Sequence, residues 1–206
     1  LGFRFSGALI DISGGNLLVL LILTAVACFI LGMGIGAITI YITLAVLVAP
    51  TLIQMGVIPI AAHLFVFWWG LTAYITPPVA INAFVASGIS GASPLKTAIQ
   101  ATRLGICTFI LPFIFVFNPG LILIGSPMEI FVAVVTTTFS VAALAVSLTG
   151  YLLTPIRWQR IPLLLASVCL VVPNLITAIS GFCIVALTAF WQIRDWRAAR
   201  VTKGVP

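Results

Sequence analysis

Residues 17–53 read LLVLLILTAVACFI-LGMGIGAIT-IYITLAVLVAPTLI, so that two apolar runs are separated by Gly32, Gly34 and Gly36. Each run is shorter than the ~20 residues that one bilayer crossing needs. A glycine in a helix interior is destabilising by roughly 1 kcal/mol relative to alanine, and three at alternate positions oppose one continuous helix. The stretch therefore predicts two half-length helices joined by an opened tip, a hairpin over residues 14–53.

A second interruption lies in the aromatic-rich segment of residues 60–88. The apolar run that ends near Ile75 is followed by Thr76, Pro77 and Pro78. Proline lacks a backbone donor and clashes with the preceding helical turn, and the second proline also restricts the first. We therefore predict a broken helix that is interrupted at this point and resumes from Val79.

The composition is typical of a membrane protein. Hydrophobic residues make up 63% of the 206 residues and charged residues 6%, with a mean hydropathy of +1.34. Soluble domains carry about 25% charged residues, so a water-soluble fold could not cover this much apolar surface. We predict an all-α membrane protein, a polytopic helical bundle, and exclude a soluble enzyme.

The chain divides into two predicted regions, residues 1–124 and residues 125–206. The first contains both interruptions, a loop from Gly88, and a short helix over residues 93–104 that has Pro94 at its first helical position. An apolar helical region over residues 105–124 follows, and a turn at Asn118-Pro119-Gly120 divides it after Phe117. The second begins with the longest uninterrupted apolar span, from about Ile130 onward. It ends in a basic tail.

Basic residues predict the orientation, because cytoplasmic loops carry an excess of lysine and arginine. If the hairpin has both ends on one side, four basic residues share one side, which we predict to be cytoplasmic: Lys96, Arg103, Arg157 and Arg160. The tail is expected on the same side: Arg194, Arg197, Arg200 and Lys203. Residues 161–191 must then form two short helices or a re-entrant pair; one span with an external tail is the alternative. Topology thus explains the net charge of +6 without nucleic acid as a partner.

Residues that could perform catalysis are few. His63 is the one histidine, and we predict that it is an interfacial polar residue rather than a ligand or proton carrier. The acids are Asp11, Glu129 and Asp195, and they form no cluster in the sequence. The cysteines each lie in an apolar run and are predicted to be small buried hydrophobes: Cys28, Cys107, Cys169 and Cys183. We therefore expect no enzyme activity and no cofactor.

Polar side chains gather around the two interruptions. Thr39 follows the glycines, and Thr72, Thr76 and Asn82 flank the prolines. Non-helical backbone is tolerated at membrane depth only where it is buried in protein or lines a watery cavity, and broken helices form ion and substrate sites in many secondary transporters. Hydroxyl and amide oxygens suit a hard cation such as Na⁺. The alternative is structural: glycines allow close helix packing, the prolines are kinks, and the threonines satisfy freed backbone groups.

Four segments carry a resemblance to a known family: residues 31–34 (LGMG), 61–67 (AAHLFVF), 75–80 (ITPPVA) and 87–92 (SGISGA). Further matches lie at residues 103–105 (RLG), 112–119 (PFIFVFNP) and 150–153 (GYLL). Together they resemble the large membrane subunit of tripartite ATP-independent periplasmic (TRAP) transporters. More narrowly, they are similar to the fused permease that works with TAXI-class binding proteins. The resemblance extends over residues 17–181.

The resemblance implies a Na⁺-driven importer in the bacterial inner membrane, which takes organic acids or similar small solutes from a periplasmic binding protein. It makes residues 1–124 the transport core of the second repeat, with residues 32–39 as the tip of a re-entrant hairpin. Residues 76–80 become the unwound middle of the facing helix, and the two move together against a fixed scaffold. The implied substrate and ion site consists of Gly32, Gly34, Gly36, Thr39, Thr72, Thr76, Pro77, Pro78 and Asn82. Na⁺ is implied at Gly32, Gly34 and Thr76.

The tip departs from the pattern of that family. Fused permeases of this type usually have a proline and two threonines where this chain has Gly36, Ala37 and Ile38. The hydroxyl ligands expected there are missing, and Thr39 is the nearest substitute. Because the sequence begins at Leu1 rather than Met, we expect it to be the C-terminal piece of a longer permease. The alternative function is a non-transporting membrane scaffold that assembles partner subunits.

Overall fold

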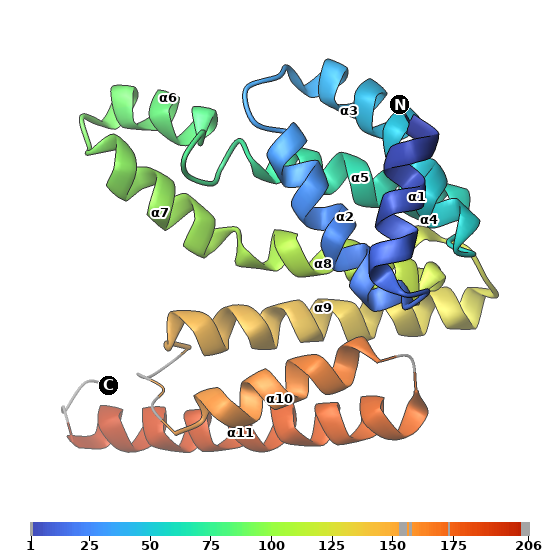
Figure 1. The fold of residues 1–206 in the computed structure, drawn as a ribbon. Coiled ribbons are helices and arrows are strands. Elements are labelled where there is room, and N and C mark those ends of the chain that lie inside the picture. The colour runs from blue at the N-terminus through green and yellow to red at the C-terminus, as the bar shows by residue number, and fades with distance from the viewer. Residues whose placement is uncertain (1, 153–155, 157, 173, 203–206) are drawn as a thin grey trace. The chain divides into compact units, whose positions relative to one another are not determined.

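A computed structural model describes residues 2–152, 156, 158–172 and 174–202 (Figure 1). Every regular element in this described part is a helix, which confirms the prediction of an all-α polytopic membrane protein. Four stretches are long and apolar enough to cross a membrane: Ala37–Gln54, Pro94–Phe117, Pro127–Thr149 and Ile176–Arg194. The chain forms two compact units, Leu1–Val116 (unit 1) and Phe117–Pro206 (unit 2).

Unit 1 begins with a helix that the sequence did not predict, α1 (Gly2–Ser13). It ends at Gly14 and Gly15, which both have positive φ, +58° and +77°, a conformation that glycine adopts without strain. The Asn16 side chain then accepts hydrogen bonds from the backbone N–H groups of Leu18 and Val19. This N-cap starts α2 and stabilises it by about 1 kcal/mol.

The first apolar stretch forms two helical arms separated at the glycines, as predicted, but the second arm is not half-length, because it lies in the stretch Ala37–Gln54 that is long enough to cross a membrane. α2 (Leu17–Leu31) is separated from α3 (Ala37–Leu47) by the glycine-containing turn. A short further helix, α4 (Ala49–Gln54), follows and has Pro50 in its first turn, a position where the missing N–H needs no helical partner. Both arms of the hairpin pack against the next helix, α5 (Pro59–Thr72).

Two glycines allow this close packing between the hairpin and α5. A Cβ atom added to Gly32 would collide with the carbonyl oxygen of Gly70 on α5. A Cβ atom on Gly70 would lie 2.7 Å from Ile40 Cγ2 and 2.8 Å from Leu44 Cδ1 of α3. Small residues of this kind let helix backbones approach closely in membranes, and α5 is held between the two arms in this way.

The other side of α5 packs against α8 (Ile106–Phe117) through aromatic rings. Phe65 and Phe113 meet edge to face with ring centroids 5.3 Å apart. Trp69 makes the same kind of contact with Phe109 at 5.5 Å, as does Trp68 with Phe115 at 5.6 Å. Each such pair contributes about 0.5–1.5 kcal/mol beyond its buried area. The packing of α8 therefore stabilises α5, the helix that precedes the interruption at Pro77 and Pro78.

After the break, α6 (Ile81–Ser90) and α7 (Pro94–Leu104) form a hairpin around a small core of Ala80, Ala83 and Ala98. The sequence predicted a loop from Gly88, but α6 continues to Ser90. The reason is that Gly91, with φ +69°, takes the left-handed conformation that ends the helix. Pro94 occupies the first turn of α7 as predicted.

Unit 2 consists of a 3-10 turn, η1 (Pro119–Ile122), and three helices, α9 (Pro127–Thr149), α10 (Arg160–Val171) and α11 (Leu175–Thr202). The region over residues 105–124 is divided as predicted, because α8 ends at Phe117 and a turn follows it. Asn118 leaves the helical region at φ −133° and ψ 82°, and Pro119 has no N–H to continue the helix. The two compact units divide between Val116 and Phe117, and the division into functional regions at residue 124 stays a prediction.

Hydroxyl groups join the helices of unit 2. Ser140 on α9 donates a hydrogen bond of 2.7 Å to the carbonyl oxygen of Ser167 on α10, and Ser147 donates one of 2.8 Å to that of Arg160. Gly181 of α11 lies where an added Cβ atom would be 2.6 Å from Leu170 Cγ of α10. Small and hydroxylated residues thus replace large apolar ones at these helix contacts, as membrane helices commonly do.

Two expectations for unit 2 need correction. α11 is not short: it has 28 residues and continues well beyond the predicted end at Trp191. Cys183 is exposed rather than buried, whereas Cys28 is buried as predicted, because the outer face of a membrane helix faces lipid rather than a protein core. The side chains of the basic tail from Arg197 onward lie outside the described residues, and the side of the membrane on which the tail lies stays a prediction.

The contact between Gly32 and Gly70 predicts unequal effects for two alanine substitutions. Gly32→Ala should destabilise the protein by about 1–3 kcal/mol, because two backbones must separate. Gly36→Ala is the matched control, since its Cβ would meet no atom within 4 Å and its φ of −63° suits alanine. Thermal unfolding of the purified variants in detergent measures the difference. Equal midpoints for the two variants would contradict the close approach.

Candidate functional site

The candidate site consists of two non-helical segments of unit 1, the tip (residues 32–36) and the break (residues 73–80). The tip reverses the chain between α2 and α3, and Gly34 has a φ of +82° that favours glycine. Gly36 precedes α3 without any side-chain cap. The tip therefore leaves the first N–H groups of α3 unoccupied by side chains.

The break follows α5 and is held by its own backbone. The N–H of Ala80 donates to the carbonyl oxygens of Ala73 and Thr76, each at 3.1 Å, and the N–H of Asn82 donates to that of Tyr74 at 3.1 Å. The hydroxyl of Thr102 on α7 donates to the carbonyl oxygen of Ile75 at 3.0 Å. These bonds stabilise the segment in an unwound conformation, and the two prolines prevent it from continuing as a helix.

Ala80 occupies an unusual conformation at the end of the break. Its φ of +41° and ψ of 42° lie in the left-handed region, which non-glycine residues rarely adopt and which carries strain. Ala80 is fully buried and packs with Ala98 of α7. The packing of α6 on α7 therefore maintains the conformation at which the chain becomes helical again.

One side-chain hydrogen bond joins the two segments. The Tyr74 hydroxyl in the break donates to the carbonyl oxygen of Ile35 in the tip at 2.6 Å. Gly70, which Gly32 approaches closely, lies near the end of α5, shortly before the break begins. Two segments that are 39 residues apart in the chain are thus held side by side.

Two of the predicted threonines, Thr72 and Thr76, lie beside or in the break, and their hydroxyl groups donate to carbonyl oxygens of nearby residues. Thr72 is buried and donates to the carbonyl oxygen of Trp69 at 2.7 Å, and Thr76 donates to that of Thr72 at 2.8 Å. Their oxygen lone pairs remain available as acceptors or ligands. Thr39 and Asn82 are exposed in the first turns of α3 and α6. Within the described residues, no hydrogen bond joins these two side chains to the other predicted site residues.

Unpaired carbonyl groups are the chemical feature that the tip and the break share. No described residue donates a hydrogen bond to the carbonyl oxygens of three consecutive tip residues, Gly32, Met33 and Gly34. The same holds in the break for three more, Pro77, Pro78 and Val79. Backbone oxygens without partners are costly at membrane depth, and oxygen ligands are what hard cations prefer.

The two helix starts add positive partial charge near these oxygens. α3 begins after Gly36 and α6 after Ala80, and neither has a side-chain cap. The unsatisfied N–H groups and dipole at a helix start favour anions. The arrangement can therefore accept a cation at backbone oxygens and an anionic group at helix starts.

Three participants were not predicted from the sequence: Tyr74, Ile35 and Gly70. A usable signal exists for Tyr74, because a tyrosine hydroxyl in an apolar segment needs a hydrogen-bond partner. Nothing in the sequence identifies that partner as the carbonyl of Ile35. Gly70 carries a weaker signal, as a lone glycine inside a helical pattern indicates close packing.

His63 lies on α5 beside the hairpin rather than in the tip or the break. Its Nδ1 atom is 3.4 Å from the hydroxyl oxygen of Tyr41 on α3. The two line a groove of about 310 Å³ together with Phe67, which meets Tyr41 edge to face at 5.4 Å. No group of three or more histidine, cysteine or acidic side chains gathers within the described residues.

The chain matches the family described as tripartite ATP-independent periplasmic transporter, DctM component, over residues 1–130. The chain belongs to this family. The DctM match includes both the tip and the break and ends in the first turns of α9. It makes the chain a component of a transporter rather than an enzyme. No curated protein and no solved structure was found to match the chain.

The bond between Tyr74 and Ile35 predicts that Tyr74→Phe loosens the tip. Cys28, buried one turn before Gly32, is a native reporter of such loosening. A hydrogen bond between membrane helices contributes about 0.6–1.7 kcal/mol, so alkylation of Cys28 should become about three- to eighteenfold faster. Peptide mass spectrometry separates this site from the other cysteines. Tyr41→Phe is the control, and an equal acceleration in that variant would contradict the assignment.

Proposed function

We propose that this chain is the permease component of a Na⁺-coupled, binding-protein-dependent TRAP transporter. It imports organic acids or similar small solutes across the bacterial inner membrane. The observation that carries this proposal is the hydrogen bond from Tyr74 to Ile35, which joins two segments that each present unpaired carbonyl oxygens. Membership of the DctM family supports the transporter class. Coupling to Na⁺, the class of substrate and the location in the inner membrane go beyond family membership and are part of our proposal.

Na⁺ is bound between the tip and the break in this proposal. The carbonyl oxygens of Gly32 and Gly34 provide ligands from the tip, and Thr76 provides one from the break. Unwound carbonyls of this kind coordinate Na⁺ in other secondary transporters. The chain has Gly36, Ala37 and Ile38 where hydroxyl ligands were expected, so backbone oxygens carry most of the coordination.

The substrate binds beside the ion, at the starts of α3 and α6. A carboxylate is attracted by the positive ends of the two half-helices. Thr39 and Asn82 lie in the first turns of these helices and are exposed, so their side chains are suited to hydrogen-bond the substrate. Thr72 and the prolines, Pro77 and Pro78, hold the shape of the break.

Coupling follows from the shared position of the two ligands. Na⁺ that binds both segments favours the state in which tip and break are closed together, and a substrate that binds the same state is favoured in turn. The tip and the break then move as one element against a scaffold. A TAXI-type periplasmic binding protein delivers the substrate, and an N-terminal half that precedes Leu1 stays a prediction.

The test is uptake by the complete permease in liposomes with its binding protein, with an inward Na⁺ gradient or a matched K⁺ gradient. Wild-type uptake should require Na⁺. Thr76→Ala should raise the Na⁺ concentration for half-maximal uptake about tenfold, and Asn82→Ala should weaken the substrate dependence by a similar factor.

Thr138→Ala is the matched control for these variants. It removes a hydroxyl that donates to the carbonyl oxygen of Val134 on the exposed face of α9, in unit 2. Its uptake should equal that of the wild type. Uptake that ignores Na⁺ would contradict the coupling, and unchanged constants in both site variants would contradict the site. No flux of any solute would favour the scaffold alternative.

A further inference from the structure

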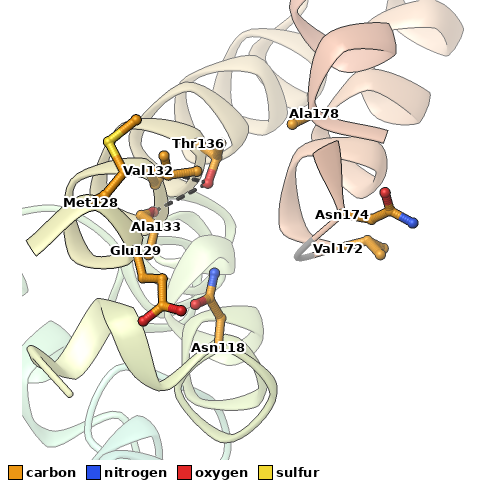
Figure 2. A pocket seen from close by; sticks show the side chains of 9 residues that line it. All are labelled: Asn118, Met128, Glu129, Val132, Ala133, Thr136, Val172, Asn174 and Ala178. Carbon is orange, nitrogen blue, oxygen red and sulfur yellow. Dashed lines mark hydrogen bonds between the residues drawn. The ribbon is translucent and has the colours of Figure 1, made fainter. Parts of the chain in front are cut away.

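Unit 2 contains a groove of about 260 Å³ that is separate from the tip and the break (Figure 2). One wall is the first three turns of α9, with Asn118 beside them. The other wall is lined by Val172 and Asn174, which lie between α10 and α11, and by Ala178 in the first turn of α11. Neither the family resemblance nor the transport proposal assigns a role to this groove.

The walls are fixed by close contacts. A Cβ atom on Gly120 would lie 3.0 Å from the Cβ of Ala133 and 3.1 Å from the carbonyl oxygen of Glu129, so η1 packs directly on α9 and positions Asn118. Phe139 of α9 meets Phe182 of α11 edge to face at 5.2 Å. Both η1 and α11 are therefore packed directly on α9.

The floor of the groove is apolar. Val132, Ala133 and Ala178 are apolar lining residues, and the two alanines are buried. Thr136 turns its hydroxyl toward its own helix, where it donates to the carbonyl oxygens of Val132 at 2.9 Å and Ala133 at 3.3 Å (Figure 2). An occupant of the floor consequently meets methyl and methylene groups.

The mouth of the groove is polar and carries one charge. The backbone N–H of Ser126 donates to Oε2 of Glu129 at 2.8 Å, and this capping box fixes the carboxylate. No described residue donates to its other oxygen, Oε1. The Asn174 Oδ1 atom accepts from the N–H of Ile176 at 3.1 Å, which leaves its NH₂ group as a donor. Asn118 makes no side-chain cap and adds a second carboxamide.

The position of the mouth matches the boundary between hydrocarbon and water. Glu129 lies in the first turn of α9, a stretch of 23 residues that is long enough to cross a membrane. At 1.5 Å per residue the helix is about 34 Å long, which places Glu129 at one edge. Among the described side chains of unit 2, Glu129 is the one carboxylate. An occupant of this groove therefore has an apolar part, a cation for the carboxylate and an acceptor for the carboxamides.

We propose that the groove binds a bilayer phospholipid with a zwitterionic ethanolamine headgroup. The primary ammonium donates to Oε1 of Glu129, and the phosphate accepts from the NH₂ groups of Asn118 and Asn174. The beginning of one acyl chain lies on Val132, Ala133 and Ala178. Typical small-molecule pockets have about 300–1,000 Å³, so a groove of about 260 Å³ accommodates part of the lipid while the rest stays in the bilayer.

Native mass spectrometry of the complete permease, titrated with phosphatidylethanolamine or phosphatidylglycerol, tests this site independently of transport. The wild type should prefer the ethanolamine lipid, and Glu129→Gln should reduce that preference about tenfold. Glutamine also serves in a capping box, so this variant keeps the start of α9. Ser126→Ala is the control that weakens the cap and keeps the carboxylate, and its lipid preference should persist.

A second pair of variants tests the floor. Ala178→Leu fills the groove and should lower binding of the ethanolamine lipid. Ala189→Leu is matched to it, because it fills another cavity of unit 2, of about 180 Å³, whose described lining has no carboxylate. Equal binding of the two lipids by the wild type, or an unchanged preference in Glu129→Gln, would overturn the proposal. So would a photo-crosslinker at Met128 that captures a polypeptide and no lipid.

Discussion

The hydrogen bond from the Tyr74 hydroxyl to the Ile35 carbonyl oxygen joins the two non-helical segments on which the rest of the structure depends. Two segments without helical hydrogen bonding lie in a protein that is embedded in lipid, where every backbone polar group needs a partner from protein, ion or trapped water. The chain places these two segments side by side, so that a donor in the break reaches an acceptor in the tip. The close approach of Gly32 and Gly70 makes the contact possible, and the aromatic packing of α5 on α8 supports it.

Local chemistry allowed both interruptions to be predicted from the sequence. The glycines at 32, 34 and 36 and the pair Pro77-Pro78 act within one or two turns, and the helices end where those residues require it. The partner of Tyr74 could not be predicted, because a contact across 39 residues depends on how α2, α3 and α5 pack. The length of α11 was missed, since an apolar run gives no boundary of its own without a strong cap or proline signal. Which carbonyl groups stay unpaired depends on the positions of all donors, and those positions are set by the three-dimensional fold.

Close contacts at small residues serve a different purpose in each unit. In unit 1, glycine lets backbones meet at a segment that exposes carbonyl oxygens. In unit 2, glycine and serine join continuous helices, and the groove that carries the Glu129 carboxylate lies at the start of α9. The groups to which the two proposals assign ligands therefore lie at helix starts or just before them, where free N–H groups and capping side chains are available. Under the two proposals, unit 1 binds ion and solute while unit 2 binds a specific lipid.

The central claim is that tip and break form one cation site, and amide hydrogen exchange of the complete permease tests it most directly. Exchange is followed for peptides that contain residues 32–38 and residues 73–82, in Na⁺ and in K⁺ at equal ionic strength. Peptides of α9 and α11 serve as internal references. We predict that Na⁺ slows exchange in both segments over the same concentration range and leaves the references unchanged. Protection of one segment alone, or equal exchange in Na⁺ and K⁺, would contradict the shared cation site.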